Sequence, residues 1–180
     1  METILLLGNA KDHALRNTLL PALERYGGVL YAGERQIFRM TSEQPAYFVY
    51  DCERLPDLQI DRGVLLFKGS CTAEERLRVP EGVRCVSDSG NRSAIRLLQE
   101  AGAPAITCGT SARDTLSAAS LEYGRAVLSL QRSIVTLGGK LLEPHDFGVG
   151  VAGGSLSREI LPVSLVLLLS GVDSGEGYVV

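Results

Sequence analysis

Six short apolar runs recur through the first 109 residues, and this recurrence constrains the fold more than any other feature of the sequence. A short apolar run bounded by turn residues is typical of a strand buried on both faces, as the strands of a parallel sheet are. The runs alternate with helical patterns or longer connections, which favours an α/β architecture. We therefore predict three layers, with a mostly parallel sheet and helices on both of its faces. The six runs are TILLLGN, VLYAG, AYFVYD, GVLLFKG, GVRCVSD and PAITCG.

A first helix is predicted after the first strand, because apolar residues recur there with a helical period. Asp12 is its expected N-terminal cap, since a carboxylate accepts hydrogen bonds from the free N–H groups of a first turn. Pro21 is expected to kink or shorten the helix, and Gly27 and Gly28 are expected to end it. Its buried face is predicted to consist of Leu15, Leu19, Leu20 and Leu23.

A second helix is predicted over residues 91–102, in the sequence NRSAIRLLQEAG. Its apolar residues have helical spacing, and Ile95, Leu98 and Ala101 are predicted to face the core. Gly102 is expected to end the helix, because glycine readily adopts the left-handed conformation that closes many helices. The helix lies between the fifth and sixth predicted strands, as the crossover helix of a parallel sheet does.

The pattern changes after Gly109. Residues 110–150 contain two glycine turns, at 123–124 and 138–139, which predict hairpins and an antiparallel β extension. A C-terminal helix is predicted within 151–171, with Ser155 or Ser157 as its cap. Because this helix is apolar on all sides, we expect it to pack in the core; the alternative is that it contacts another protein. The tail after it either frays or adds a last strand. We predict that these parts and residues 1–109 form a single domain over residues 1–180.

Composition and charge exclude several classes of protein. Hydrophobic residues make up 45% of the chain and charged residues 22%, as in an ordinary globular protein. The formal net charge of -3 offers no basic surface, so we expect no nucleic-acid partner. The sequence contains no apolar run of about 18 residues, so we expect no contact with a membrane. The first residues, METILLLGN, have no basic leader, and we expect a cytoplasmic protein.

The cysteines are expected to be reduced. Their spacings match no zinc motif, and each lies in or beside an apolar run, where a thiol packs as a small hydrophobic group. Metal binding or redox chemistry is the alternative, and Cys108 with His145 is a conceivable nucleophile–base pair. The four residues are Cys52, Cys71, Cys85 and Cys108.

The turn after the first predicted strand, residues 8–12, begins as a phosphate-binding loop does. In the motif G-x-x-x-x-G-K-[ST], glycines let backbone N–H groups surround the phosphates, the lysine contacts the terminal phosphates, and the hydroxyl holds magnesium. Here the second glycine and the hydroxyl are missing, and Asp12 follows Lys11 with a charge that repels phosphate. Taken alone, the segment is either an ordinary strand-to-helix turn or the remnant of a nucleotide site.

Residues 86–120, VSDSGNRSAIRLLQEAGAPAITCGTSARDTLSAAS, resemble the second half of the central domain of Mur ligases. That family joins amino acids to peptidoglycan precursors with ATP. Its members carry a strand ending in N-x-D-D-x, a helix ending in Gly, a strand ending in a phrase such as T-F-G, and then D-x-x. The segments SDSGN, LLQEAGAPAITCG and SARDTLSAAS follow in that order at similar distances. An antiparallel segment comes next, as in the family, and GGSLSREILPVSLVLLL takes the place of its G-x-H-N-x-x-N-x-x-A-A helix.

The N-terminal half resembles the same domain in layout. The segment ILLLGNAKDHALRNTLLPALERYGGVLYAG has the order of the family's T-G-T-N-G-K-T-T loop, helix and next strand. AYFVYDCERL is similar to the strand that ends in the family's metal-linked glutamate, at or near Asp51, and RGVLLFKGS to the following strand, which usually ends in T-N. Asp51 and Glu53 place two carboxylates at a strand end, where open α/β sheets bind ligands.

The sequence departs from the family pattern where the family's chemistry lies. Lys11 is near the place of the phosphate-binding lysine, but without its glycine and threonine partners. The pair at 69–70, Gly-Ser, replaces T-N, and the segment 87–89 only partly keeps the acidic turn. Gly154-Ser155 replaces the adenine-side His-Asn. We expect a stand-alone domain, without the flanking domains that would orient the precursor and the amino acid for reaction.

These observations predict a degenerate, non-catalytic Mur-ligase-like module with no cofactor and no bound metal. We expect it to bind a protein partner or a small ligand. The alternative is a nucleotide-binding protein or ATP-dependent ligase-like enzyme that retains a weakened phosphate site. The residues expected at a ligand site are Gly8, Asn9, Lys11, Asp51, Asp88 and Asn91.

Overall fold

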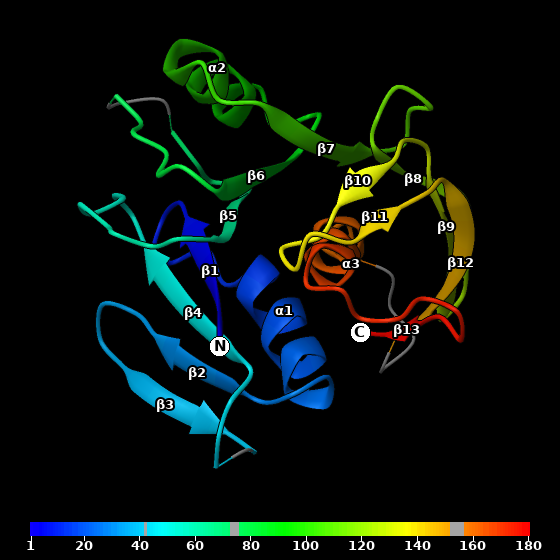
Figure 1. Ribbon diagram of the computed structural model, residues 1–180, viewed down its shortest axis with the longest axis horizontal. Coiled ribbons are helices and arrows are strands. Elements are labelled where there is room, and N and C mark those ends of the chain that lie inside the picture. Colours follow the sequence, from blue (N-terminus) through cyan, green and yellow to red (C-terminus); the bar gives the residue numbers. More distant parts are fainter. Residues whose placement is uncertain (42, 73–75, 152–156) are drawn as a thin grey trace.

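Strand β1 (Glu2–Leu7) lies inside the sheet with a parallel neighbour on each side, β4 (Tyr47–Cys52) and β5 (Gly63–Phe67). The last four residues of β1 are buried, because both faces of the sheet are covered there. This agrees with the uninterrupted apolar runs of the sequence. The computed structural model in Figure 1 describes residues 1–180 except 42, 73–75 and 152–156.

The sheet has 11 strands in the order β13-β12-β9-β8-β7-β6-β5-β1-β4-β2-β3. In this order, all pairs from β8 across the sheet to β2 are parallel, whereas β3 pairs antiparallel with β2 at one edge. At the other side, β9 pairs antiparallel with both β8 and β12. The prediction of a mostly parallel sheet with an antiparallel extension is therefore confirmed. The further strands are β2 (Val29–Ala32), β3 (Ile37–Met40), β6 (Val83–Asp88), β7 (Ala105–Gly109), β8 (Leu116–Glu122), β9 (Arg125–Leu130), β12 (His145–Gly150) and β13 (Tyr178–Val179).

Helices cover the two faces of the sheet unequally. Helices α1 (Ala14–Arg25) and α3 (Ile160–Leu169) pack on one face, in a cluster that includes Ile4 and Leu66. Helix α2 (Arg92–Ala101) packs on the opposite face, in a cluster that includes Leu5 and Leu65. Figure 1 shows α1 and α3 side by side in the middle of the molecule and α2 apart from them beside β6 and β7. The prediction of helices on both faces is confirmed.

Helix α3 is buried along its whole length, as the sequence predicted for a helix apolar on all sides. It contacts α1 and strands β5 to β8. A separate hairpin of β10 (Ile134–Val135) and β11 (Leu141–Leu142) lies over it in Figure 1. The predicted cap was wrong for Ser157, because Glu159 is the N-terminal cap residue and its side chain makes no capping hydrogen bond. Ser155 and Gly154 lie outside the described residues.

Helix α1 differs from expectation in two respects. Its cap residue is His13 and not Asp12, although Asp12 Oδ1 accepts a hydrogen bond from the N–H of Ala14 at 3.2 Å. Of the two effects expected of Pro21, the shortening is not seen, because the helix continues through Pro21 to Arg25. Pro21 is exposed, so the carbonyl that loses a partner to proline can be hydrated. The predicted buried face of α1 is confirmed.

The other helix predictions were correct in extent but not always in orientation. Helix α2 ends at Gly102 in the left-handed conformation, as predicted. Its buried residues are Ala94, Leu97 and Leu98, whereas Ala101 is exposed. Of the three predicted core residues, Leu98 is therefore buried, Ile95 is half-buried and Ala101 is exposed. The C-terminal tail adds the short strand β13, parallel to β12.

All four cysteines are free and buried, so the prediction that they pack in the core is confirmed. Among the described residues, no helix has the length and apolar character needed to cross a membrane.

Candidate functional site

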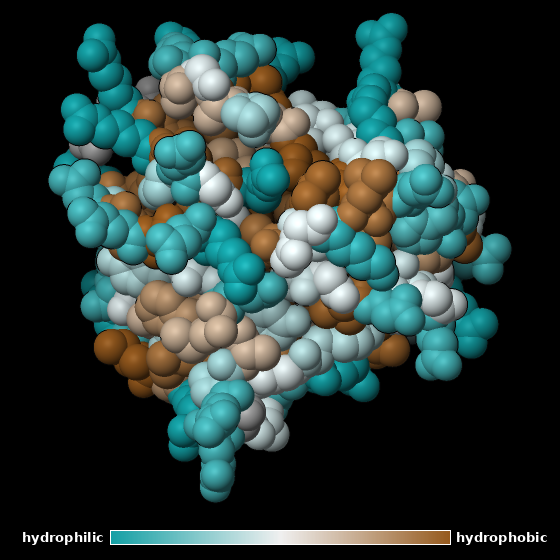
Figure 2. All heavy atoms as spheres, in the orientation of Figure 1, coloured by the Kyte–Doolittle hydropathy of each residue, from teal (hydrophilic) through white to brown (hydrophobic). Residues whose placement is uncertain are grey.

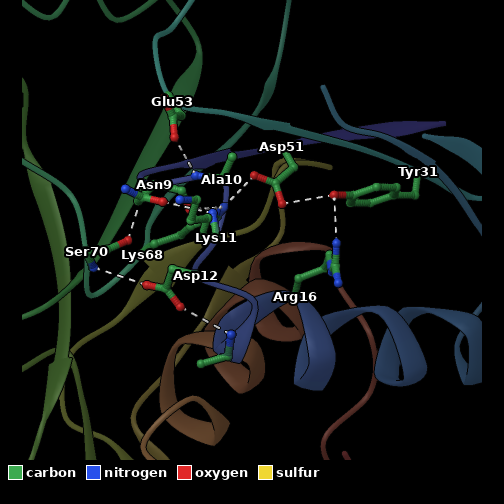
Figure 3. Close-up of polar contacts among 11 residues, drawn as sticks. Asn9, Ala10, Lys11, Asp12, Arg16, Tyr31, Asp51, Glu53, Lys68 and Ser70 are labelled. Atoms are coloured by element: carbon green, nitrogen blue, oxygen red, sulfur yellow. Dashed lines mark hydrogen bonds and ion pairs between the residues drawn. The ribbon is translucent and has the colours of Figure 1, made fainter. Parts of the chain in front are cut away.

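Three neighbouring parallel strands, β1, β4 and β5, end side by side. Gly8 directly follows β1, Asp51 is the last residue but one of β4, and Lys68 directly follows β5. From β1 the chain continues toward β2 on one side of the sheet, and from β5 it continues toward β6 on the other side. Such a reversal of direction leaves a crevice at the carboxyl ends of the strands, where open α/β sheets bind ligands. The polar contacts in this region are drawn in Figure 3.

Gly8 permits a very close approach of the turn to Lys68. Its φ is +151°, and a Cβ at this position would lie 2.7 Å from Lys68 Cβ. The Lys68 side chain is completely buried beneath the turn. Its Nζ donates to the carbonyl of Asn9 at 3.0 Å and forms an ion pair with Asp51 Oδ1 at 2.5 Å. The ammonium group therefore binds the turn to the end of β4.

The backbone N–H groups of residues 8–12 all donate to acceptors of the protein itself. Three of these acceptors come from β4 and β5 or the residues just after them, and two come from Asn9. In a phosphate-binding turn the same groups would be free to face the ligand. The bonds run from Gly8 to Cys52 O (3.1 Å), Asn9 to Ser70 Oγ (3.1 Å), Ala10 to Glu53 Oε1 (2.8 Å), Lys11 to Asn9 Oδ1 (2.8 Å) and Asp12 to Asn9 O (3.0 Å).

Asp51 is buried and shares its two carboxylate oxygens between two partners. Oδ1 pairs with Lys68, and Oδ2 accepts a hydrogen bond from the Tyr31 hydroxyl at 3.0 Å. Burial and the neighbouring Asp51 carboxylate raise the pKa of Tyr31, so the phenol stays protonated and donates. Arg16 lies over the Tyr31 ring, 5.7 Å from its centroid, and connects this buried chain of contacts to the surface of α1.

Asp12 connects the start of α1 to the end of β5. Its Oδ2 accepts a hydrogen bond from the N–H of Ser70 at 3.2 Å, while Oδ1 accepts from Ala14. Partial burial by itself would raise the pKa of Asp12, but hydrogen bonds from Ser70 and Ala14 and the positive charge of Lys68 lower it below its usual value. Asp12 is therefore ionised at neutral pH and places a negative charge at the N-terminus of α1.

The structure brings four of the six predicted site residues into direct contact with Lys68 or with the turn, and places the other two less centrally. Gly8, Asn9 and Asp51 surround Lys68, and Asn91 Nδ2 donates to the Lys68 carbonyl at 2.9 Å. Lys11 belongs to the turn, but its side chain is exposed.

Asp88 lies outside this group, at the end of β6 and before the turn that leads to α2. Its Oδ1 accepts a hydrogen bond from the N–H of Gly90 at 2.7 Å, and Oδ2 lies 3.6 Å from Arg158 Nη2. With Asp12 and Asn91 it lines a cavity of about 350 Å³ at the start of all three helices.

A larger cavity, of about 620 Å³, borders the turn on the α2 side of the sheet. It is lined by Gly8, Asn9, Glu53 and Ser70, and continues between the β4–β5 and β5–β6 connections. The volume lies in the range of about 300–1,000 Å³ that is usual for small-molecule sites.

Sequence analysis did not single out Lys68, which is the central cation of the site. Its signal was a lysine at the end of the otherwise apolar run GVLLFKG, where a charge can be buried only if it is paired. Tyr31 was likewise missed, because an aromatic residue in a strand is ordinarily a core residue.

The alternative chemical sites weighed from the sequence are not assembled. Burial raises the pKa of every cysteine thiol, to about 12 for Cys52 and about 11 for Cys85, which disfavours the reactive thiolate. Cys108 donates to the Ser87 carbonyl, whereas His145 contacts Ser174, so the two do not form a pair. Among the described residues, no three histidine, cysteine or acidic side chains are grouped as metal ligands.

Comparisons with known proteins identify a fold. No protein-family model matches the chain, and no curated protein matches it in sequence. A solved structure of UDP-N-acetylmuramoyl-L-alanyl-D-glutamate–2,6-diaminopimelate ligase is similar, with a TM-score of 0.54 and 12% sequence identity. The similarity covers 98% of this chain and 45% of that one, so the chain spans less than half the length of the ligase. The chain therefore has a fold that is found in a Mur ligase.

Proposed function

We propose that this protein is a non-catalytic module with a Mur-ligase-like fold, in which the N–H groups of the turn at residues 8–12 are occupied by acceptors of the protein itself and not by a nucleotide phosphate. In this role it binds a protein partner or a small ligand, and it needs neither a cofactor nor ATP. The observation that carries the proposal is that every N–H group of residues 8–12 already has an acceptor within the chain.

The chemistry of those acceptors opposes phosphate. The Glu53 carboxylate accepts from Ala10 at 2.8 Å, and the Asp12 carboxylate accepts from Ala14 and Ser70. A phosphate would have to displace these contacts and then lie beside two negative charges. Hydrogen bonds to charged groups contribute about 1.5–3 kcal/mol each, so displacing even one of them costs much of the free energy of a weak anion contact.

The buried cation, Lys68, is likewise fully paired within the protein. Lys68 cannot serve as a phosphate-binding lysine in this arrangement, because its Nζ is paired with Asp51 and bonded to Asn9 under the turn. Lys11 is exposed and offers a single hydrated charge. An exposed charge of this kind contributes at most about 1 kcal/mol to the binding of an anion.

The proposal is tested by calorimetric titration with ATP and magnesium. We expect no binding at micromolar ATP by the wild type and no magnesium-dependent hydrolysis above background. The double variant Glu53→Ala, Asp12→Thr frees the Ala10 amide and supplies a hydroxyl near Lys11, so we expect measurable binding only there. Glu143→Ala, which removes an exposed carboxylate remote from the turn, is the matched control and should behave as wild type.

A different result would favour the alternative, a working nucleotide site. Binding of ATP by the wild type with a micromolar Kd would contradict the proposal. So would an ATP turnover that disappears in Lys11→Ala, because that loss would show that the exposed lysine contacts the phosphates.

A further inference from the structure

One part of the sheet is covered by irregular chain in place of a helix. On the α2 side, the β4–β5 connection (residues 53–62) and the β5–β6 connection (residues 68–82) cover the strands beside β1, and their described residues form no helix. Parallel sheets usually carry helices on both faces. Here the two connections flank the cavity of about 620 Å³ described above.

The floor of this cavity is apolar. Leu7 at the end of β1 and Leu97 of α2 line it, and both side chains are nearly completely buried. Leu55, Leu77 and Val79 from the two connections are half-buried against the same cluster. In Figure 2, hydrophobic side chains are set back among hydrophilic ones at the upper left, where these connections lie in Figure 1.

Two arginines lie on the wall of the cavity. Arg76 and Arg78 both line it and are exposed on either side of Leu77. Of the carboxylates among the described lining residues, Glu53 already accepts a hydrogen bond from the Ala10 amide. Guanidinium groups of this kind recognise carboxylates, sulfonates and phosphates through paired hydrogen bonds.

We infer that this cavity binds a small organic anion with an apolar body. The apolar body lies on the floor formed by Leu7 and Leu97, and the anionic group is held at the rim by Arg76 and Arg78. This inference rests on the proposed ligand-binding function and names its site and ligand class. The ligand does not use the N–H groups of residues 8–12, because these are occupied.

The probe for this site is 1-anilinonaphthalene-8-sulfonate, which combines an aromatic body with one sulfonate. We expect saturable one-to-one binding to the folded protein, measured by fluorescence. The charge-reversing variant Arg76→Glu, Arg78→Glu should bind it about tenfold more weakly or worse, since reversing charges at a binding site costs affinity. Arg35→Glu, Arg125→Glu is the matched control, because both arginines are exposed and lie outside the cavity lining.

Methyl NMR locates the bound probe. We expect the largest shift changes at Leu55, Leu77, Val79 and Leu97. Circular dichroism establishes that each variant is folded, and the milder Arg78→Gln, which should weaken binding about threefold, replaces the double variant if that one is not folded. Equal affinity of the arginine variants and the control, shift changes confined to other parts of the chain, or no saturable binding would each overturn the inference.

The same samples are titrated with ATP, which separates the two proposals. Binding of ATP by the wild type that persists in Arg76→Glu, Arg78→Glu contradicts the proposed function, whatever the fluorescent probe does. Absence of probe binding, with ATP also unbound, overturns the cavity site and leaves the filled turn as proposed.

Discussion

Replacing Lys68 with methionine removes the ammonium group that holds the turn while keeping most of the volume of the side chain. Lys68 has no exposed surface and Asp51 is only 5% exposed, so the remaining carboxylate would stay buried with the Tyr31 hydroxyl as its partner. Removing one member of a buried ion pair typically costs about 3–5 kcal/mol, because the other charge is left uncompensated. The Asn9 carbonyl loses one donor but keeps the N–H of Asp12 at 3.0 Å, so it adds little to this cost.

We therefore expect Lys68→Met to lower the free energy of unfolding by about 3–5 kcal/mol, a large part of the roughly 5–15 kcal/mol of a typical domain. Urea unfolding followed by circular dichroism at neutral pH measures this value from the midpoint and slope. The double variant Lys68→Met, Asp51→Asn removes both charges and should be more stable than the sum of the single losses predicts.

Two outcomes of these unfolding measurements would contradict a buried, interacting pair of Lys68 and Asp51. A loss below about 1 kcal/mol in Lys68→Met would place the pair in the class of exposed ion pairs and contradict its burial. Additive losses in the double variant would show that the two charges do not interact, although their atoms are 2.5 Å apart.

Three further predictions concern other described contacts. Gly8→Ala should lower the free energy of unfolding in urea by more than about 2 kcal/mol, because φ is +151° and the new Cβ would collide with Lys68 Cβ. Gly69→Ala is the control and should be nearly neutral, because a Cβ there has no atom within 4 Å. Asp12→Asn should lower the free energy of unfolding at neutral pH, and this loss should disappear as pH falls through the lowered pKa of Asp12, because a carboxylate with a depressed pKa stabilises the fold only while it is ionised. Unfolding curves of wild type and variant between pH 7 and pH 2 would contradict this if their difference in unfolding free energy stayed constant. Ser164→Ala should be neutral or stabilising by up to about 1 kcal/mol in thermal unfolding, because the buried Ser164 hydroxyl has no hydrogen-bond partner among the described residues; a clear loss would indicate a partner.

The strands of the parallel sheet could be predicted because each is a continuous apolar run between turn residues, such as GVLLF in β5. Strand β3 was missed because its residues are exposed or half-buried, and even Ile37 is 75% exposed. Its sequence therefore has no apolar run of the kind that marks a buried strand. The cap of α1 was misplaced by one residue because Asp12 is drawn toward Ser70, a contact between segments 58 residues apart.

The candidate site was predictable in location but not in composition. The carboxyl ends of neighbouring strands meet at one edge, so Gly8 and Asp51 were expected together. The role of Lys68 depends on β1 lying between β4 and β5, an order that adjacent residues do not encode. The cavity likewise depends on how two irregular connections lie over the sheet, for which the sequence carries no periodic signal.

The complete burial of α3 has a consequence for the order in which the chain can fold during synthesis. This helix comes from residues 160–169, yet it fills the space between α1 and strands β5 to β8, which are made earlier. A nascent chain that ends before residue 160 can form hydrogen bonds between its strands but leaves Leu66, Val86 and Leu116 without their covering helix. Such an intermediate exposes an apolar face and is prone to association, so synthesis of residues 160–169 completes this core and ends that exposure.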